Sequence, residues 1–321
     1  MNRRLRLVLL ILVALAVLLG PRPAVVEPSA VKAAPPALAA IPAWLAEREA
    51  RAGVADTGVA KRVTFADSLP RRTPYAVVYL HGFSATRQET APLAEEVARG
   101  LRANLFETRL RGHGLPGDSM GVARAGDWLD DAVEALEVAS RLGDSLVVIG
   151  TSTGGTLATW LATHPTYGAR VHRLVLISPN FGVADGTAEW LTAPWAELVL
   201  PRLMPWREWT ARTPEQGRYW TTRYPSAALF PMQALVEVVR DKPLAGYRAP
   251  TLLFVHANDH VVDAARTAAW VARLRAASPS VRVTEVPVVP RDGEDGHVVV
   301  GRILAPSRVE GFREEIVRFV R

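Results

Sequence analysis

The feature that most constrains this chain is an apolar run that ends in a tight glycine–serine turn and continues with helical spacing. Residues 146–149 are Leu-Val-Val-Ile, the kind of run that is buried in a parallel sheet. Residues 150–154 are Gly-Thr-Ser-Thr-Gly, a G-x-S-x-G pattern. A strand that turns this sharply into a helix leaves no room for a Cβ beside the turn, which accounts for the glycines. The pattern therefore predicts a nucleophile elbow that presents Ser152 above the end of a sheet.

The serine pattern on its own is a weak signal. Three fixed positions occupied by common residue types arise by chance in roughly one chain in ten of this length. An ordinary strand–turn–helix in which Ser152 caps the helix is the alternative interpretation. The sequence on either side of the turn has to decide between a capping serine and a nucleophile.

Apolar runs and amphipathic stretches alternate from residue 75 to the C-terminus. The strand-like runs are residues 75–80, 104–110, 146–149, 171–177, 251–256 and 281–289. The stretches with helical spacing are residues 91–101, 128–142, 264–277 and 307–320. This alternation is typical of the α/β class, and it predicts a mostly parallel, doubly wound sheet with helices on both faces.

One long segment, residues 181–247, interrupts the alternation. It is rich in aromatic side chains and contains no clear parallel strand. These aromatic residues are Trp190, Trp195, Trp206, Trp209, Tyr219, Trp220, Tyr224 and Phe230. We interpret the segment as a helical cap over the C-terminal edge of the sheet, where ligands bind in open α/β folds. Its aromatics either line an acyl-sized pocket or pack the cap onto the body.

The chain supplies the partners that a serine nucleophile needs, in the order serine, acid, histidine. Asp259 follows the strand at 251–256, and His297 lies in the loop after the last strand. We predict that Ser152 is the nucleophile, that His297 is the base and then the acid, and that Asp259 orients the histidine. Asp185 and Asp263 are alternative acids, although Asp263 is placed to cap the next helix.

Two backbone N–H groups are expected to form an oxyanion hole. One belongs to Thr153, directly after the nucleophile, and the other to Phe83, in the loop after the strand at 75–80. We expect His81 and His113 to order the loops that carry them. No grouping of acids and histidines in the sequence predicts a metal site.

Composition excludes several functions. The chain has 321 residues and no cysteine, which excludes disulfides, cysteine nucleophiles and thiolate metal sites. The formal net charge is +6, but the arginines beyond the N-terminus are scattered among acids. This distribution argues against a nucleic-acid partner and leaves association with an anionic membrane surface open.

The N-terminus has the composition of an export signal. Arg3, Arg4 and Arg6 precede an apolar run over residues 7–19. We predict that residues 1–20 are a signal peptide or an N-terminal membrane anchor. The protein would then be exported, either to the periplasm or another extracytoplasmic space, or held at the membrane by this segment.

The remaining chain divides into a linker and one domain. Residues 21–42 are rich in alanine and proline and lack periodicity, which predicts a linker. Residues 43–321 are predicted to form one α/β domain that includes the cap.

Taken together, five motifs resemble the α/β-hydrolase superfamily, in its monoglyceride lipase and lysophospholipase (serine aminopeptidase-like) branch. These motifs are His-Gly-Phe-Ser at 81–84, Arg-Gly-His-Gly at 111–114, Gly-Thr-Ser-Thr-Gly at 150–154, Asn-Asp-His-Val-Val at 258–262 and Gly-His-Val at 296–298. The resemblance implies the α/β-hydrolase fold with a cap. It also implies a carboxylic ester hydrolase that uses neither a metal nor an organic cofactor.

The leading functional hypothesis is hydrolysis of a small-molecule acyl ester through an acyl-serine intermediate. Peptide or amide hydrolysis uses the same machinery, and a non-catalytic exported binding protein on a hydrolase fold is a third possibility. An aminopeptidase needs an acid in its pocket to hold the substrate's amino group, and because the cap contains acids, the sequence leaves the choice between the first two open. Those acids are Glu189, Glu197, Glu208 and Glu215. The sequence does not indicate an oligomeric state.

Overall fold

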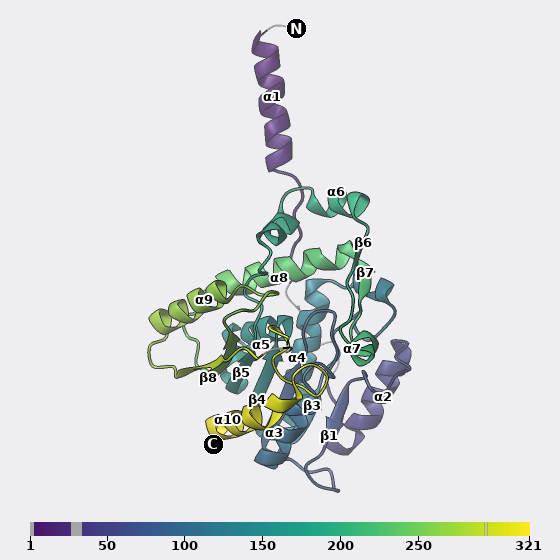
Figure 1. Cartoon of the computed structure of the whole chain (residues 1–321), viewed down its shortest axis with the longest axis vertical. Helices are drawn as coiled ribbons and strands as arrows, with labels where there is room; N and C mark the ends of the chain where they lie inside the picture. The colour runs from purple at the N-terminus through teal and green to yellow at the C-terminus, as the bar shows by residue number, and fades with distance from the viewer. Residues whose placement is uncertain (1–2, 27–33, 292, 294) are drawn as a thin grey trace.

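A computed structural model describes residues 3–26, 34–291, 293 and 295–321. Its centre is a seven-stranded sheet in the order β1-β3-β2-β4-β5-β8-β9 (Figure 1). The strands are β1 (Arg62–Thr64), β2 (Thr73–Leu80), β3 (Asn104–Glu107), β4 (Gly143–Thr151), β5 (Val171–Ile177), β8 (Thr251–His256) and β9 (Val283–Val288). All neighbours pair in parallel except β1, which runs antiparallel to β3. The predicted mostly parallel sheet is confirmed.

Helices cover both faces of this sheet. Alternate residues of a strand point to opposite faces, so Val77 and Val78 of β2 lie in two different hydrophobic cores. On the Val77 side the sheet packs against α3 (Leu93–Leu101) and α10 (Val309–Val320). On the Val78 side it packs against α4 (Ala125–Leu142), α5 (Thr153–Thr163), α8 (Leu229–Asp241) and α9 (Ala264–Ala277). The fold is therefore doubly wound, as predicted.

The predicted elements match the observed ones closely, and the main omission is β1. This strand is only three residues long, and its sequence Arg-Val-Thr lacks an apolar run. Its place is fixed by pairing with β3 at the edge of the sheet rather than by burial of its side chains. A strand held by tertiary pairing carries little signal in the sequence.

The cap lies between β5 and β8 and is less helical than predicted. It contains the 3₁₀ helices η4 (Gly186–Thr192) and η5 (Ser226–Ala228) and the helices α6 (Ala196–Leu203) and α7 (Pro214–Tyr219). It also contains two short antiparallel strands, β6 (Trp206–Glu208) and β7 (Arg223–Pro225). The following helix α8 falls inside the predicted cap segment, yet its Leu235 and Val236 are fully buried in the main core. The insertion over the sheet edge is thus shorter than 181–247.

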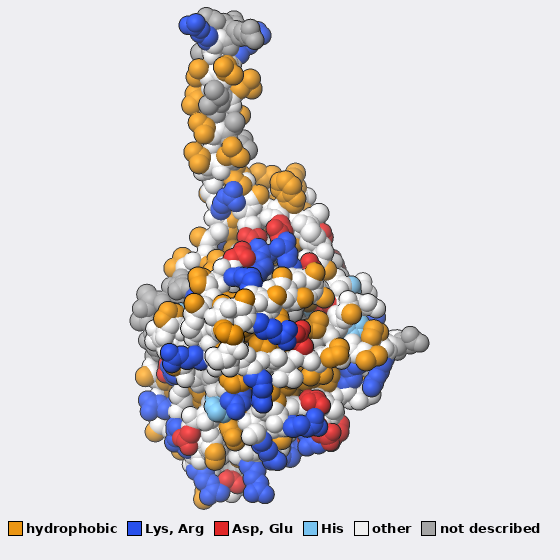
Figure 2. Space-filling view, turned by 90° about the vertical axis from the view of Figure 1, so that its left-hand side faces the viewer, with side chains coloured by type: hydrophobic (Ala, Val, Ile, Leu, Met, Phe, Trp, Pro, Cys, Tyr) orange, Lys and Arg blue, Asp and Glu red, His pale blue; other side chains and the backbone are white. Residues whose placement is uncertain are grey.

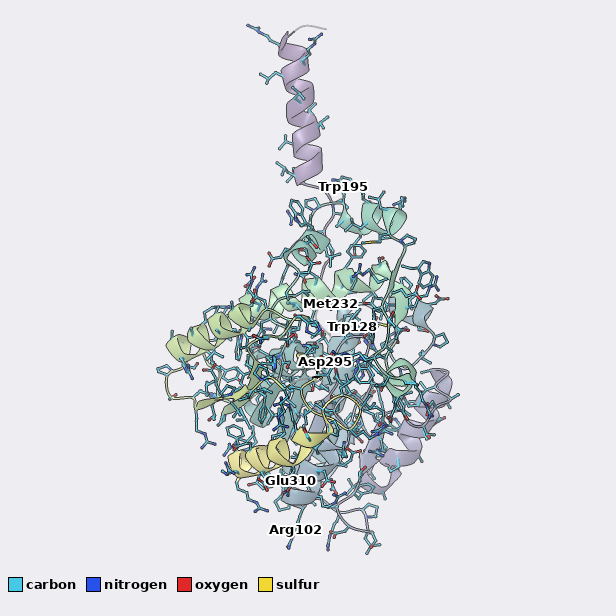
Figure 3. All side chains as sticks on the ribbon, in the orientation of Figure 1. Arg102, Trp128, Trp195, Met232, Asp295 and Glu310 are labelled. Carbon is cyan, nitrogen blue, oxygen red and sulfur yellow. The ribbon has the colours of Figure 1, made fainter. Side chains whose placement is uncertain are left out.

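The N-terminal segment leaves the body beside the cap (Figures 1 and 3). Helix α1 (Arg3–Leu18) projects away from the body, and the chain below it is held by the cap. The Trp195 N–H donates to the carbonyl of Pro21 at 2.8 Å, and Arg22 donates to the carbonyl of Thr192 at 3.2 Å. Over the residues described, no helix combines the length and the apolarity needed to span a membrane.

The boundary between the predicted linker and the domain differs from the structure. Ile41, placed in the linker, begins α2 (Ile41–Arg51) and is fully buried in the main core. Val25 also packs against this core. Residues 1–2 of the predicted signal and 27–33 of the predicted linker lie outside the described residues. The body therefore includes parts of the alanine- and proline-rich segment.

Candidate active site

Ser152 lies at the turn between β4 and α5, as the glycine pattern predicts. Its backbone angles, φ 52° and ψ −121°, fall in a region that non-glycine residues rarely adopt. A Cβ at Gly154 would lie 2.0 Å from the carbonyl oxygen of Leu80, and one at Gly150 would lie 2.4 Å from that of Gly154. Both glycines are therefore required by close backbone packing, which forces the serine outward at the end of the sheet.

The structure brings Ser152, His297 and Asp259 into one hydrogen-bonded chain. His297 Nε2 is 3.0 Å from Ser152 Oγ, and His297 Nδ1 is 2.8 Å from Asp259 Oδ2. The other oxygen of Asp259 accepts from the backbone N–H groups of Val261 and Val262. Because the carboxylate accepts at Nδ1, the proton of the neutral imidazole sits there and Nε2 is free to accept the serine proton. This is the geometry that a serine nucleophile and its base require.

Charges around His297 favour its protonated form. Burial by itself would lower its pKa, but the hydrogen bond and charge of Asp259, together with the charges of Glu89 and Asp295, raise the pKa above its usual value. Asp295 also fixes the loop, because its Oδ1 accepts from the N–H groups of His297 and Val298 at 2.8 and 2.9 Å. Asp292 and Glu294 of the same loop lie outside the described residues.

Residues 81–84, here called the oxyanion loop, are held by His81. The N–H of Leu110 donates to His81 Nε2 at 3.0 Å, so the ring proton is on Nδ1 and points to the carbonyl of Gly82 at 2.9 Å. That carbonyl also accepts from the N–H of Ala85. In a trans peptide the following N–H, that of Phe83, faces the opposite way. The predicted loop-ordering role of His81 is confirmed.

The two predicted oxyanion donors both border the site. Thr153 is the first residue of α5, whose N-terminal N–H groups have no partner within the helix. Phe83 packs edge-on against His113 and Tyr224. His113 is fully buried, and its Nδ1 contacts the carbonyl of Arg111, so it orders the loop as predicted. The donor roles of Phe83 and Thr153 stay predictions, because they depend on a bound substrate.

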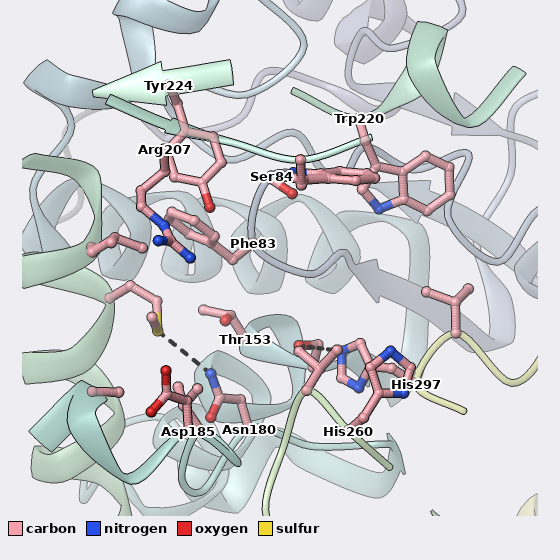
Figure 4. A pocket seen from close by; sticks show the side chains of 18 of the residues that line it. Phe83, Ser84, Thr153, Asn180, Asp185, Arg207, Trp220, Tyr224, His260 and His297 are labelled. Carbon is pink, nitrogen blue, oxygen red and sulfur yellow. Dashed lines mark hydrogen bonds between the residues drawn. The ribbon is translucent and has the colours of Figure 1, made fainter. Parts of the chain in front are cut away.

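A cavity of about 870 Å³ opens above Ser152 (Figure 4). Its base is formed by the serine, His297 and the oxyanion loop, and its roof by the cap. Apolar side chains from the cap and α8 line it: Trp190, Leu191, Leu200, Met204, Trp209, Trp220, Tyr224, Leu229 and Met232. A cavity of this size and lining is typical of a small-molecule site. The two interpretations of the cap aromatics, lining a pocket or packing the cap, therefore each apply to some of them. Some line the cavity, and others, such as Trp195 and Trp206, do not.

The alternative acids lie elsewhere. Asp185 borders the cavity but is exposed and accepts from Thr187, not from the histidine. Asp263 caps α9 by accepting from the N–H of Ala265 at 2.8 Å, as predicted. His260 borders the cavity, whereas His256 is buried and does not line it. In the part of the chain that the structure describes, no three His, Asp or Glu side chains are grouped so as to hold a metal ion.

None of the four cap acids lines the cavity. Glu189 forms ion pairs with Arg240 and Arg266 on the surface. Glu208 and Glu215 likewise face surface arginines. The acids that do border the cavity are Glu89, Asp185 and Asp295.

Sequence reasoning did not single out Glu89 or Asp295. Asp295 stands two residues before His297, and a short acid just ahead of a catalytic candidate is a recognisable turn signal. Glu89 gave no such signal, because it lies in an irregular segment before α3. The structure places its carboxylate against the N–H of Gly82 at 2.8 Å, deep in the interior.

Comparison with known proteins assigns the chain to a protein family. The sequence model of the alpha/beta hydrolase family matches residues 77–304. The chain belongs to this family, and it is a hydrolase with lipase and esterase relatives.

Individual relatives extend this result. A thermostable monoacylglycerol lipase from Bacillus sp. (strain H-257) is 28% identical over 190 residues, which cover 59% of this chain and 72% of the relative. The predicted resemblance to the monoglyceride lipase branch is thereby confirmed.

Solved structures share the fold at low sequence identity. One from work on the metagenome-derived lipolytic enzymes LipS and LipT has a TM-score of 0.64 at 20% identity and covers 83% of this chain and 98% of its own. A soluble variant of monoglyceride lipase from Saccharomyces cerevisiae, bound to a substrate analogue, has a TM-score of 0.60 at 12% identity, with coverages of 81% and 90%.

Proposed function

We propose that this protein is a serine hydrolase that cleaves carboxylic acyl esters through an acyl-serine intermediate. The observation that carries the proposal is the hydrogen-bonded chain Ser152–His297–Asp259 at the base of the apolar cavity. Its family membership and the monoacylglycerol lipase among its relatives support the same chemistry.

The geometry suits a two-step mechanism. Ser152 Oγ attacks the ester carbonyl while His297 Nε2 takes its proton, and the buried carboxylate of Asp259 stabilises the imidazolium that forms. The N–H groups of Phe83 and Thr153 bind the oxyanion. His297 then protonates the departing alcohol, which leaves the acyl group on the serine. Water attacks the acyl-serine with the same residues in the same roles, and the carboxylic acid departs.

The cavity indicates the substrate class. An apolar lining that comes largely from the cap fits an acyl chain, and about 870 Å³ is more room than a short acid needs. We propose medium- or long-chain monoesters, such as a monoacylglycerol. Peptide hydrolysis is the second candidate: the four cap acids lie outside the cavity, but Asp185, Glu89 and Asp295 border it and could hold an amino terminus.

A direct comparison of substrates tests this function. The purified protein is assayed with p-nitrophenyl esters of graded acyl length beside aminoacyl anilides. We expect ester turnover that depends on Ser152 and little or no anilide turnover. Anilide cleavage that exceeds ester cleavage would show a peptidase or amidase instead.

We further propose that the protein is exported and works at a membrane surface. Apolar side chains of α1 and α6 are exposed at the same end of the molecule (Figure 2). Leu198, Val199 and Leu203 of α6 are 45%, 49% and 75% exposed, and the neighbouring Met204 also lines the cavity. An apolar patch next to the cavity suits a lipid surface from which an acyl ester can enter.

Vesicle binding tests the membrane proposal. The full-length chain should co-sediment with vesicles that contain anionic lipid, and a Leu198→Ser/Leu203→Ser variant should bind several-fold more weakly. Val289→Ser is the control, because Val289 is 68% exposed and belongs to neither α1 nor α6. Equal binding by all three proteins would contradict a role for α6. Recovery of the full-length protein from the cytoplasm alone would contradict export.

A further inference from the structure

A carboxylate that the reaction above does not use is buried beside the oxyanion loop. Glu89 is 2% exposed, and its Oε2 accepts from the N–H of Gly82 at 2.8 Å and from the hydroxyl of Tyr79 at 3.1 Å. The same tyrosine hydroxyl lies 3.3 Å from Oγ1 of Thr151, the residue before the nucleophile. Glu89 is therefore joined both to the oxyanion loop and, through Tyr79, to the nucleophile elbow.

This carboxylate is also close to Ser152 itself. An ideal Cβ on Gly82 would lie 2.7 Å from Glu89 Oε1 and 3.1 Å from Ser152 Cβ, so both side chains press on the same face of that glycine. The backbone around Glu89 supports the histidine loop as well, because the N–H of Arg302 donates to the carbonyl of Ala91 at 2.8 Å. One short segment thus contacts the oxyanion loop and the loop that follows His297, and it is linked to the nucleophile elbow through Tyr79.

We propose that Glu89 is a positioning residue for the ester hydrolysis proposed above, holding Gly82 in place and stabilising the imidazolium of His297 with its negative charge. The inference rests on the proposed function, because an imidazolium forms only if His297 takes the serine proton. It adds to Asp259 a second carboxylate, which borders the same cavity as His297 and accepts from the oxyanion loop at Gly82.

The electrostatics agree with this role. Burial raises the pKa of Glu89 to about 7. The hydrogen bond from Gly82, the charge of His297 and the hydrogen bond from Tyr79 act in the opposite direction, because each favours the charged carboxylate. The ring of His297 contacts Ser152 and Asp259, and the charges of Asp259, Glu89 and Asp295 raise its pKa against the effect of burial. When His297 becomes positive in the reaction, its charge favours ionised Glu89, so the two groups titrate as a coupled pair.

Isosteric replacement tests the proposal through the pH profile. We compare kcat and KM for p-nitrophenyl butyrate in wild type and Glu89→Gln at pH values from about 5 to about 9. The variant should lose about tenfold in kcat with little change in KM, and the acid limb of its profile should move down by about one pH unit. Wild-type kcat with an unmoved acid limb would overturn the proposal.

Two further variants separate this role from a merely structural one. Glu107→Gln is the matched control, because burial also raises the pKa of Glu107 to about 7, but neither it nor its ion-pair partners Arg62 and Arg87 line the cavity. Its pH profile should match that of wild type. Tyr79→Phe keeps the carboxylate and removes one donor, so its activity should fall at neutral pH and recover at alkaline pH. A pH-independent loss in Tyr79→Phe would contradict the electrostatic role.

A readout without substrate distinguishes failure of this inference from failure of the proposed function. The His297 Cε1–H resonance, assigned by its absence in His297→Ala, is titrated by NMR in wild type and Glu89→Gln. Its midpoint should be lower in the variant, even if no ester is hydrolysed. An unchanged midpoint would overturn the coupling between Glu89 and His297. Absence of Ser152-dependent ester turnover in wild type would instead refute the proposed function.

Discussion

The carboxyl ends of the sheet strands, where Ser152 lies, are called the edge below. This edge and the cap above it are built in opposite ways. At the edge, Ser152, His297 and the side chain of Asp259 are buried and hydrogen-bonded, and close backbone packing dictates the glycines of the elbow. In the cap, the elements are short, and α6 buries only Ala196, while its Leu198 and Leu203 are exposed. Under the proposed function, the edge would fix the chemistry and the cap would select the substrate.

This division has an energetic basis. A catalytic geometry must be held to a fraction of an ångström, which needs buried partners on rigid elements. An acyl chain needs only apolar volume, which side chains of several arrangements can supply. Changes at the edge should therefore alter kcat by large factors, and changes in the cap should alter kcat/KM by small factors that depend on acyl length.

The largest effect is expected at the nucleophile. Ser152→Ala removes the attacking hydroxyl, and kcat for p-nitrophenyl butyrate should fall by about 10⁶-fold. Circular dichroism and the melting temperature should stay close to wild type, because alanine fits the same turn. Substantial ester turnover by the folded variant would contradict the assignment of the nucleophile to Ser152 at the edge.

The next largest effect is expected at Asp259. Asp259→Asn offers an N–H or a weaker acceptor to Nδ1, which favours the wrong imidazole tautomer, and kcat should fall by about 10⁴-fold. Asp185→Asn serves as the control, since Asp185 borders the same cavity without contacting His297. A large loss in the control together with a small loss in Asp259→Asn would move the orienting acid to the earlier loop.

The contribution of the cap should appear in the dependence of kcat/KM on acyl length. Burial of one methylene group is worth roughly 0.8 kcal/mol, a little under fourfold in binding. If the cavity takes the acyl chain, kcat/KM should rise severalfold for each two carbons added and then level off when the cavity is full. A profile that is flat or falling beyond acetyl would contradict an acyl site under the cap.

Two tryptophans three residues apart sharpen this test. Both are half-buried, but Trp209 lines the cavity, whereas Trp206 does not line it and stacks on the guanidinium of Arg223 at 3.9 Å. Trp209→Ala should lower kcat/KM for long-chain esters by about tenfold or less, since a few buried methylenes are involved. Trp206→Ala should leave the length profile unchanged. Equal profiles in the two variants would show that the cap aromatics only pack the cap.

The smallest effect is expected at Asp295. The charge of this carboxylate contributes to the raised pKa of His297, which must be neutral to accept the serine proton. Activity in wild type should therefore fall as pH decreases through a midpoint above about 6.5, the ordinary histidine value. In Asp295→Asn that midpoint should move down by less than about one pH unit, because Asp259 remains. A midpoint that rises would contradict a contribution of the Asp295 charge to the raised pKa of His297.

The sequence predicts the edge of the sheet far better than the cap. The elbow is predictable because only glycine fits at positions 150 and 154, and the order of Ser152, Asp259 and His297 follows the order of the strands. The position of Glu89 was not predictable, because its contact with Gly82 depends on how the segment before α3 packs. The cap was predicted as helical throughout, but β6 and β7 form by pairing with each other. Such pairing leaves no periodic pattern.

Covalent labelling shows directly whether Ser152 is the nucleophile. The wild-type protein is treated with an alkyl fluorophosphonate, and the modified peptide is identified by mass spectrometry while residual ester turnover is measured. We expect one added phosphonyl group on Ser152, loss of activity in proportion to labelling, and no labelling in His297→Ala on the same time scale. Modification of a different serine in step with the loss of activity, or full ester turnover by protein fully labelled at Ser152, would contradict it.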